Sequence, residues 1–135
     1  KNCQLPHLKR FGTIKRMLSM TAYKRGDVVL VPFPFSDQTV IKKRPAVIIS
    51  SNVYNEISAD IIIMAITSQT EKTIGIGECL IQNWQGAGLL KPSAIKPAIS
   101  TIEQTLVLKK LGKLSRQDLT SMDTVLEELL DLKAK

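Results

Sequence analysis

The stretch VPFPFSDQTVIKKRPAVIIS, residues 31–50, joins a polar loop and three consecutive cations to an apolar run. The run itself, PAVIIS at 45–50, predicts a strand buried on both faces, because its apolar residues are continuous rather than alternating. Directly before it stand Lys42, Lys43 and Arg44. The residues alone leave two interpretations of this cluster open: a solvated basic turn at the start of the strand, or a site where an anion is held.

Short strands are predicted on both sides of this stretch. The segment RGDVVLVPF begins at Arg25 and is apolar and β-branched, and Pro32 and Pro34 predict that its far end lies at a sheet edge or bends outward. Residues 51–58 are too polar and short for more than a loop or one helical turn, and the glycines of NWQGAG (83–88) predict a turn. The other predicted strands are ADIIIMAI (59–66), IGECLIQ (76–82) and one or two within 89–97 and 100–112, with prolines marking the breaks.

The period then changes from strand-like to helical. In SRQDLTSMDTVLEELLDL, residues 115–132, Ser115 is followed three residues later by Asp118, which is close to a capping box and predicts a helix start. Apolar residues recur at helical spacing and acids occupy the other positions, so we expect an amphipathic helix with an acidic outer face. The apolar set is Leu119, Met122, Leu126, Leu129 and Leu130, and the acids are Asp123, Glu127, Glu128 and Asp131. Five or six short strands followed by one helix predict a mainly β, α+β domain with a small barrel-like sheet.

Composition narrows the class of protein. The chain has 135 residues, which is typical of one domain, and its 44% apolar content with few aromatics predicts an aliphatic core. No apolar run approaches the roughly 20 residues of a membrane span, and the first residues lack the apolar region of a signal peptide. Two cysteines, Cys3 and Cys79, without CxxC spacing, favour a reduced, cytoplasmic setting.

The net charge of +7 is concentrated at the N-terminus. Six of the 19 Lys and Arg residues lie in residues 1–24, which contain no acid, so the rest of the chain holds 13 cations against 12 acids. The total charge therefore does not indicate nucleic-acid binding, and only local clusters can. We expect residues 1–19 to be a basic tail, translated from upstream of a start at Met17 or Met20, or else a basic arm that grips an anionic partner. The single domain is expected over residues 20–135.

Residue content excludes several kinds of active site. The single histidine, His7, lies in the expected tail, so neither a histidine triad nor a histidine base is expected in the domain. One cysteine in the domain cannot supply a tetrahedral zinc site, and the sequence has no glycine-rich phosphate loop. We therefore expect neither a metal nor a cofactor, and any catalysis must depend on Arg, Lys, hydroxyl groups and one carboxylate.

Three local clusters remain as candidates. In KKRP, Pro45 biases the backbone of Arg44 toward an extended conformation, and a guanidinium offers the paired donors that suit a phosphate. In ITSQT (66–70), hydroxyl and amide side chains directly follow a buried strand. The third cluster, GLLKPSAIKP, holds Lys91, Ser93 and Lys96. Each cluster by itself also fits an ordinary surface: a basic turn, a self-capping polar loop, and lysines that lie along apolar surface.

Taken in order, the segments RGDVVLVPFPFSDQTVIKKRPAVIIS, IIIMAITSQ, GLLKPSAIK and TIEQTLVLKKLGKLS resemble the MazF/PemK toxin family over about residues 24–132. The resemblance implies a small SH3-like β-barrel of the CcdB/PemK type with a C-terminal helix, usually as a homodimer. It implies the toxin of a type II toxin–antitoxin pair, inhibited by a cognate antitoxin protein. It also implies a metal-independent, sequence-selective endoribonuclease that acts on single-stranded RNA.

Two catalytic residues are carried over by this resemblance. The family's catalytic Arg matches Arg44 in KRPAV, and its catalytic Thr matches Thr67 in ITSQ. Some members also use an Arg and an Asp near the later strand and a His in the first loop. This chain has Lys96 and Ala98 at the former positions, and its loop SDQTVIKK holds no His. The RNA-binding candidates are Lys42, Lys43, Ser68, Gln69, Lys91, Ser93 and Lys96.

Without a metal, the expected reaction is attack of the ribose 2′-OH on the adjacent phosphorus, which gives a 2′,3′-cyclic phosphate and a 5′-OH end. Arg44 would stabilise charge on the non-bridging oxygens, and Thr67 would donate to the same phosphate or orient the 2′-OH. Asp37, in the loop before Arg44, is the candidate general base. Two alternatives stay open: a non-enzymatic toxin on the same fold that poisons a protein target such as DNA gyrase, and a binding module that captures a partner peptide.

Overall fold

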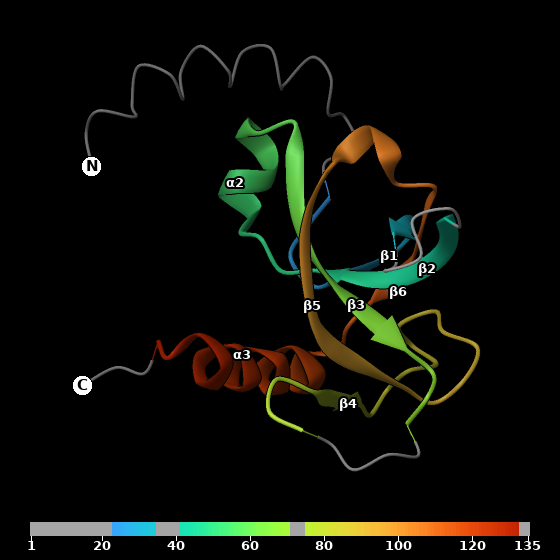
Figure 1. The fold of residues 1–135 in the computed structure, drawn as a ribbon, viewed down its shortest axis with the longest axis vertical. Coiled ribbons are helices and arrows are strands. Elements are labelled where there is room, and N and C mark those ends of the chain that lie inside the picture. Colours follow the sequence, from blue (N-terminus) through green and yellow to red (C-terminus); the bar gives the residue numbers. More distant parts are fainter. Residues whose placement is uncertain (1–22, 35–40, 71–74, 133–135) are drawn as a thin grey trace.

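The computed structural model describes residues 23–34, 41–70 and 75–132. Its strands form one six-stranded antiparallel sheet in the order β4-β5-β3-β2-β1-β6 (Figure 1). The strands are β1 (Asp27–Pro34), β2 (Ile41–Ile48), β3 (Asp60–Thr67), β4 (Cys79–Ile81), β5 (Ser93–Glu103) and β6 (Lys109–Lys113). Two helices, α2 (Asn52–Ile57) and α3 (Arg116–Leu130), and a short 3-10 helix, η2 (Gln104–Leu106), lie between or after them. The tail expected over residues 1–19 lies outside the described residues.

The sheet is a curled half-barrel with an apolar cluster on each face (Figure 1). What we call the helix-side cluster packs against α3 and contains Val28, Val47, Met64, Ile66, Cys79, Ile81, Ala87, Leu89, Ile95, Leu114, Met122 and Leu126. The inner cluster contains Val29, Val31, Phe33, Ala46, Ile48, Ile61 and Ile63. Successive residues of β1, β2 and β3 thus enter opposite clusters, which confirms the prediction that the two continuous apolar runs are buried on both faces. The predicted fold class, mainly β with a C-terminal helix, is confirmed as well.

Strand β2 begins earlier than the sequence predicted. It starts at Ile41, so Lys42, Lys43 and Arg44 are strand residues and not a turn before the strand. All three are paired with β1 in an unbroken antiparallel register that extends to the pair Pro34 and Ile41. The prediction of a start at residue 45 was wrong because backbone pairing with β1 holds the cations extended, while their side chains reach water.

The two prolines of β1 lie where only one side of the strand is paired. Strand β6 pairs with β1 from Asp27 to Leu30 and no further. Pro32 and Pro34 lie beyond that point and pair with β2 alone. A proline lacks the N–H that a second neighbour would need, so the prediction that this end of the strand lies at an edge is confirmed.

The later strands differ from the prediction in two ways. The fourth strand covers only Cys79–Ile81, because residues 75–78 form a turn in which Gly77 has a φ of 87°. Strand β5 runs through Pro97 as one element, although a break was predicted there. Pro97 falls between the β3-paired residues Ile95 and Ile99, where the register shifts, so no ladder hydrogen bond is lost.

Helix α3 begins as the capping pattern predicted. The Ser115 side chain accepts a hydrogen bond from the N–H of Asp118 at 3.1 Å. The carboxylate of Asp118 does not complete a reciprocal capping box; it accepts hydrogen bonds from the N–H groups of Gln82 and Asn83, both at 2.9 Å. Of the predicted packing residues, Leu130 is 50% exposed, so the helix extends past the sheet it covers. Among the described residues, no helix is long and apolar enough to cross a membrane.

Candidate functional site

Arg44 and Thr67 lie on neighbouring strands, each two residues beyond the pair Ala46 and Ala65 at which the β2–β3 pairing ends. The register of β2 and β3 pairs Ala46 with Ala65, and continuing it by two residues on each strand sets Arg44 opposite Thr67. Directly opposed residues of an antiparallel pair point to the same face, with Cα atoms about 4.5–5.5 Å apart. Because Ala46 belongs to the inner cluster, this is the inner-cluster face at the end of the sheet.

The Thr67 hydroxyl is held by its own loop. Thr67 is the last residue of β3 and is paired on its other side with Ala94 of β5. Its Oγ1 accepts a hydrogen bond from the N–H of Gln69 at 3.1 Å. A hydroxyl that accepts one hydrogen bond still has its own proton to donate. The half-buried Thr67 therefore has a fixed oxygen and an O–H that a bound group can accept.

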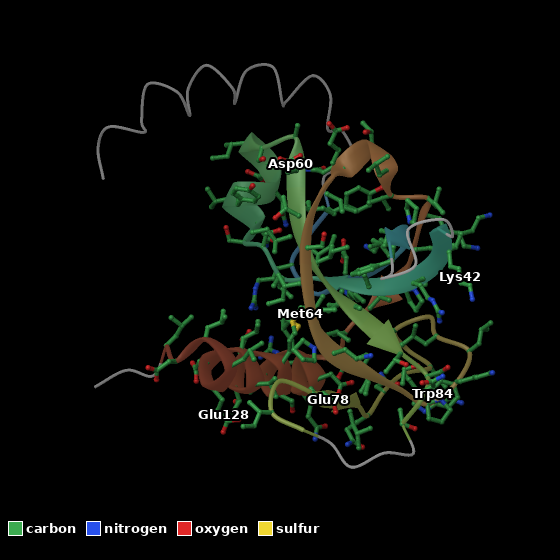
Figure 2. All side chains as sticks on the ribbon, in the orientation of Figure 1. Lys42, Asp60, Met64, Glu78, Trp84 and Glu128 are labelled. Carbon is green, nitrogen blue, oxygen red and sulfur yellow. The ribbon has the colours of Figure 1, made fainter. Side chains whose placement is uncertain are left out.

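The three cations of β2 divide between the two faces of the sheet. Arg44 pairs with Val31 of β1, and Lys42 pairs with Phe33. Both partners belong to the inner cluster, so Lys42 and Arg44 share the face of Thr67. Lys43, which alternates with them, belongs to the opposite face. Figure 2 shows Lys42 at the outer end of β2, where its exposed side chain points away from the core.

The candidates on the later segment take three different positions. Lys96 is exposed, and alternation along β5 assigns it to the face of Ala94 and thus of Thr67. Lys91 is exposed in the loop before β5. Ser93 is only 5% exposed, and its hydroxyl donates to the carbonyl oxygen of Lys91 at 2.8 Å. This contact orders the backbone at Lys91 and occupies the Ser93 hydroxyl proton.

The polar residues after β3 form a tight exposed loop. Ser68 and Gln69 are both exposed, and the Ser68 carbonyl accepts from the N–H of Thr70 at 3.1 Å. Together with the Gln69 bond to Thr67, this fixes the chain direction just beyond the strand. Asp37, the candidate base, lies outside the described residues.

Cys79 is not available as a nucleophile. The thiol lies in the helix-side cluster, and burial followed by the nearby charge of Asp118 raises the pKa of Cys79. A thiol with a raised pKa carries little thiolate at neutral pH. This residue therefore contributes packing to the domain.

We call Arg44, Thr67, Lys42 and Lys96 together the Arg44–Thr67 site. It combines a guanidinium, a hydroxyl donor and two ammonium groups on one exposed face, which is chemistry that suits an anion with several acceptor oxygens. Sequence reasoning missed that Lys42 and Lys43 diverge. The β-branched run Thr39–Ile41 was the sequence signal that could have predicted an earlier start of the strand. With that start, Lys42 and Lys43 would have been predicted on opposite faces.

Comparison with known proteins places this arrangement in context. A family model described as a PemK-like, MazF-like toxin of a type II toxin–antitoxin system matches residues 24–130. The match covers every strand and helix described above. No curated protein matches the chain at a significant level.

Solved structures share the fold at low sequence identity. An endoribonuclease in complex with its cognate antitoxin, from a mycobacterial species, is 21% identical with a TM-score of 0.69, covering 84% of this chain and all 100% of that one. MazF from Deinococcus radiodurans is 17% identical with a TM-score of 0.65, covering 82% of this chain and 97% of its own. The Mycobacterium tuberculosis toxin MazF-mt6 is 17% identical with a TM-score of 0.62, covering 78% and 99%. These similarities establish the curled sheet with its terminal helix.

Proposed function

Since the chain belongs to the PemK-like, MazF-like family of type II toxin–antitoxin toxins, as its sequence motifs predicted, we propose that it is an endoribonuclease that cleaves single-stranded RNA. The observation that supports this proposal is the β2–β3 register, which would bring Arg44 opposite Thr67 on one face if it continues two residues past the pair Ala46 and Ala65. These two residues come from separate strands and are 23 positions apart in the sequence, and we infer that both contact one phosphate. The endoribonuclease structures that share the fold support the same reading.

The reaction needs no metal. The ribose 2′ oxygen attacks the adjacent phosphorus, its bond to phosphorus forms, and the bond from phosphorus to the 5′ oxygen breaks. The 2′ proton passes to a base, and the leaving 5′ oxygen takes up a proton. The products are a 2′,3′-cyclic phosphate and a 5′-OH end. The electron pair of the broken bond stays on the leaving 5′ oxygen, and side chains or water take up and supply the protons.

Arg44 stabilises the charge that develops on the non-bridging oxygens. A guanidinium remains protonated at any working pH and presents paired N–H donors in one plane. Backbone pairing of Arg44 with Val31 of β1 fixes its position before substrate arrives. A preorganised donor of this kind contributes about 10²-fold or more to the rate.

Thr67 donates a hydrogen bond from its hydroxyl to the same phosphate, or orients the 2′-OH. The bond from the Gln69 N–H sets the position of Oγ1, so the remaining O–H does not have to be reoriented on binding. Lys42 and Lys96 hold the flanking phosphates through charge, and the exposed Lys91, Ser68 and Gln69 border the path of the strand. Asp37 is assigned as general base because it precedes Arg44 in the β1–β2 connection; Asp37→Asn should remove the acidic limb of the pH–rate profile.

A cognate antitoxin is the expected protein partner. Neighbours in fold were solved with an antitoxin bound, both from mycobacteria and from Deinococcus radiodurans. An acidic segment of such a partner would cross the Arg44–Thr67 site and compete with RNA for the same cations. A homodimer in the cytoplasm remains our expectation for the assembled toxin.

The test is cleavage of a defined RNA by the purified chain in the presence of EDTA, with the new ends mapped by sequencing. We expect cyclic phosphate ends, and a loss of about 10²-fold or more in Arg44→Ala and Thr67→Ala. Lys43→Ala is the matched control for the cation, because it lies on the same strand and faces away. Thr101→Ala, an exposed threonine of β5, is the control for the hydroxyl.

Two outcomes would contradict the proposal. Undiminished cleavage by folded Arg44→Ala or Thr67→Ala protein would remove the assigned residues. An absence of cleavage by the wild-type chain, together with growth arrest that depends on a protein target such as DNA gyrase, would instead favour the non-enzymatic toxin.

A further inference from the structure

A groove runs between the C-terminal half of α3 and the start of β1. Its volume is about 370 Å³, and we call it the α3 groove; it is lined by Arg25, Ile49, Asp123, Leu126, Glu127, Leu130 and Leu132. Two of its apolar walls are open to solvent, because Leu130 is 50% and Leu132 is 63% exposed. It stands apart from the Arg44–Thr67 site: Figure 2 shows Lys42 and Glu128 at opposite sides of the molecule. The proposed function makes no use of this groove.

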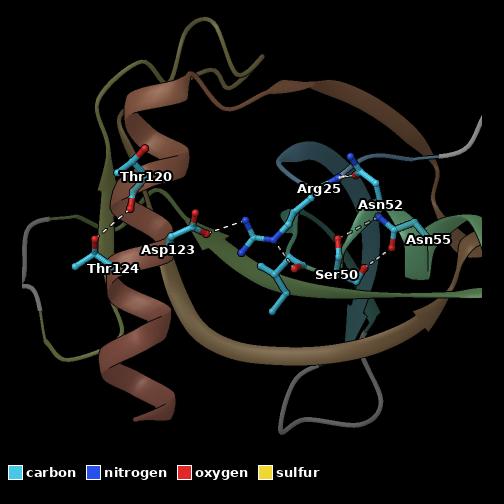
Figure 3. A network of polar contacts seen from close by, with 8 residues as sticks. Arg25, Ser50, Asn52, Asn55, Thr120, Asp123 and Thr124 are labelled. Atoms are coloured by element: carbon cyan, nitrogen blue, oxygen red, sulfur yellow. Dashed lines mark hydrogen bonds and ion pairs between the residues drawn. The ribbon is translucent and has the colours of Figure 1, made fainter. Parts of the chain in front are cut away.

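One end of the groove is fixed by Arg25. Its guanidinium makes an ion pair with Asp123 of α3 at 2.7 Å, and its Nε donates to the carbonyl oxygen of Ile49 at 2.8 Å. Its backbone N–H donates to the side chain of Asn52 at 2.7 Å (Figure 3). These contacts tie α3 to the chain around β2, so the groove keeps its shape without an occupant. Because Arg25 already makes these contacts within the domain, its charge is balanced by Asp123.

The rest of the groove is apolar with one acid, and further acids lie nearby on the chain. Glu127 lines it, and Glu128 and Asp131 follow on the same half of α3, which has no basic residue in its last turn. The negative end of the helix dipole lies at the same place and adds to the attraction for cations. From residue 123 to residue 135 the sequence holds four acids against two lysines. RNA and an acidic antitoxin segment would both be repelled here, whereas a cationic segment with apolar side chains fits the chemistry.

The chain carries such a segment directly before Tyr23 in the sequence. Residues 1–22 contain five Lys or Arg residues, no acid, and apolar residues that include Leu8, Phe11 and Ile14. They join the described chain at Tyr23, two residues before Arg25. A connection this short gives the segment a high effective concentration at the groove, in the millimolar range for a flexible link. A few residues, at about 3.3–3.6 Å each when extended, suffice to reach it.

We propose that residues 1–22 dock in the α3 groove of the same chain, with apolar side chains against Leu130 and Leu132 and cations against Glu127 and its neighbours. Docking covers the exposed leucines and neutralises the acidic helix end. It also keeps a basic segment away from RNA, so the cations that meet the substrate are those of the Arg44–Thr67 site.

The experiment is limited trypsin digestion of the full chain, read by mass spectrometry. Cleavage after Lys9, Arg10, Lys15 and Arg16 reports how often the segment leaves the groove. We expect these bonds to be cut about tenfold more slowly in the wild-type chain than in Leu130→Ser/Glu127→Gln. The difference should shrink in high salt, which screens the charge part of the attraction. Both substituted residues are exposed, so the double variant is expected to fold.

The matched control is Leu106→Ser/Glu103→Gln. Leu106 of η2 is 47% exposed, close to the value for Leu130, and neither residue lines the groove. The control should keep the wild-type digestion rate. Equal rates in all three proteins, or slow cleavage that the groove variant does not change, would overturn the proposal.

A second arm separates the chain's own segment from a second copy. A carbodiimide joins lysine to carboxylate when the two are in contact, so the wild-type chain should yield links between Lys9 or Lys15 and the acids of α3. In an equal mixture of ¹⁴N- and ¹⁵N-labelled chains, these linked peptides should carry a single label. Linked peptides with mixed labels would mean that the groove binds another molecule, and docking within one chain would then be wrong.

Discussion

The buried carboxylate of Asp118 on α3 accepts a hydrogen bond at 2.9 Å from the backbone N–H of Gln82, which lies 36 residues earlier in the chain. A second bond of the same length comes from Asn83, and Asp118 is only 1% exposed. One side chain thereby holds the turn that leads from β4 to β5. Because β5 carries Ala94 opposite Thr67, this contact supports the candidate site from a distance.

Asp118→Ala should destabilise the fold by about 2–3 kcal/mol, since it leaves two backbone donors without their charged acceptor. Urea denaturation followed by the signal of Trp84, which lies in the same turn, measures the effect. Asp123→Ala is the control, because its ion pair with Arg25 lies near the surface and should contribute at most about 1 kcal/mol. Equal losses in the two variants would contradict the assignment of a structural role to Asp118.

Gly88→Ala should be among the most damaging single substitutions. Gly88 has a φ of 82°, and a Cβ there would overlap the carbonyl oxygen of Leu111, where the turn backbone lies against β6. Strain and overlap together should cost about 3 kcal/mol or more. Gly75→Ala is the matched control, because its Cβ would meet nothing closer than 3.9 Å. A melting temperature of Gly88→Ala near that of Gly75→Ala would show that the turn can move away from β6.

Much of the fold could be predicted from local pattern. The continuous apolar runs predicted the strands buried on both faces, and Ser115 predicted the start of α3, because each signal depends on residues close in sequence. The early start of β2 and the continuity of β5 through Pro97 depend on pairing with distant strands. Local composition favoured a basic turn at Lys42–Arg44 and a break at Pro97. Pairing with β1 and with β3 instead keeps both segments in strands.

The candidate site, too, could be predicted from the sequence only in part. The motif resemblance supplied Arg44 and Thr67 as individual residues, whereas their expected opposition comes from extending the β2–β3 register by two residues. The divergence of Lys42 and Lys43 follows from strand alternation, which a turn would not impose. The role of Asp118 had no local signal, because its capping spacing was correct while its carboxylate serves a turn that is distant in sequence.

Cys79 should make stability fall with rising pH at the alkaline end. Burial, and then the charge of Asp118, raise the pKa of Cys79 above its ordinary value of 9.0. The unfolded chain therefore loses this proton first, while the folded chain keeps it. The contribution is fully present below the ordinary value and is lost progressively as pH rises toward the raised pKa. Urea denaturation at pH 7.5 and pH 9.5, in a Cys3→Ser background, should show a smaller pH step in Cys79→Ala than in its parent. An identical step in both proteins would mean that the thiol is exposed to water.

Lys42 and Lys43 should differ in their effect on RNA binding, although they are adjacent in sequence. The test is the affinity for a short RNA with 2′-O-methyl groups, which binds without being cleaved, measured between about 50 and 200 mM salt. Lys42→Ala should weaken binding and reduce the slope of log K against log salt by about 0.7, the value for one phosphate contact on a single strand. Lys43→Ala should leave the slope unchanged, because its side chain belongs to the face opposite Arg44. Equal reductions in both variants would mean that the RNA follows the edge of β2 rather than its inner-cluster face, and Arg44 and Thr67 would then not share one phosphate.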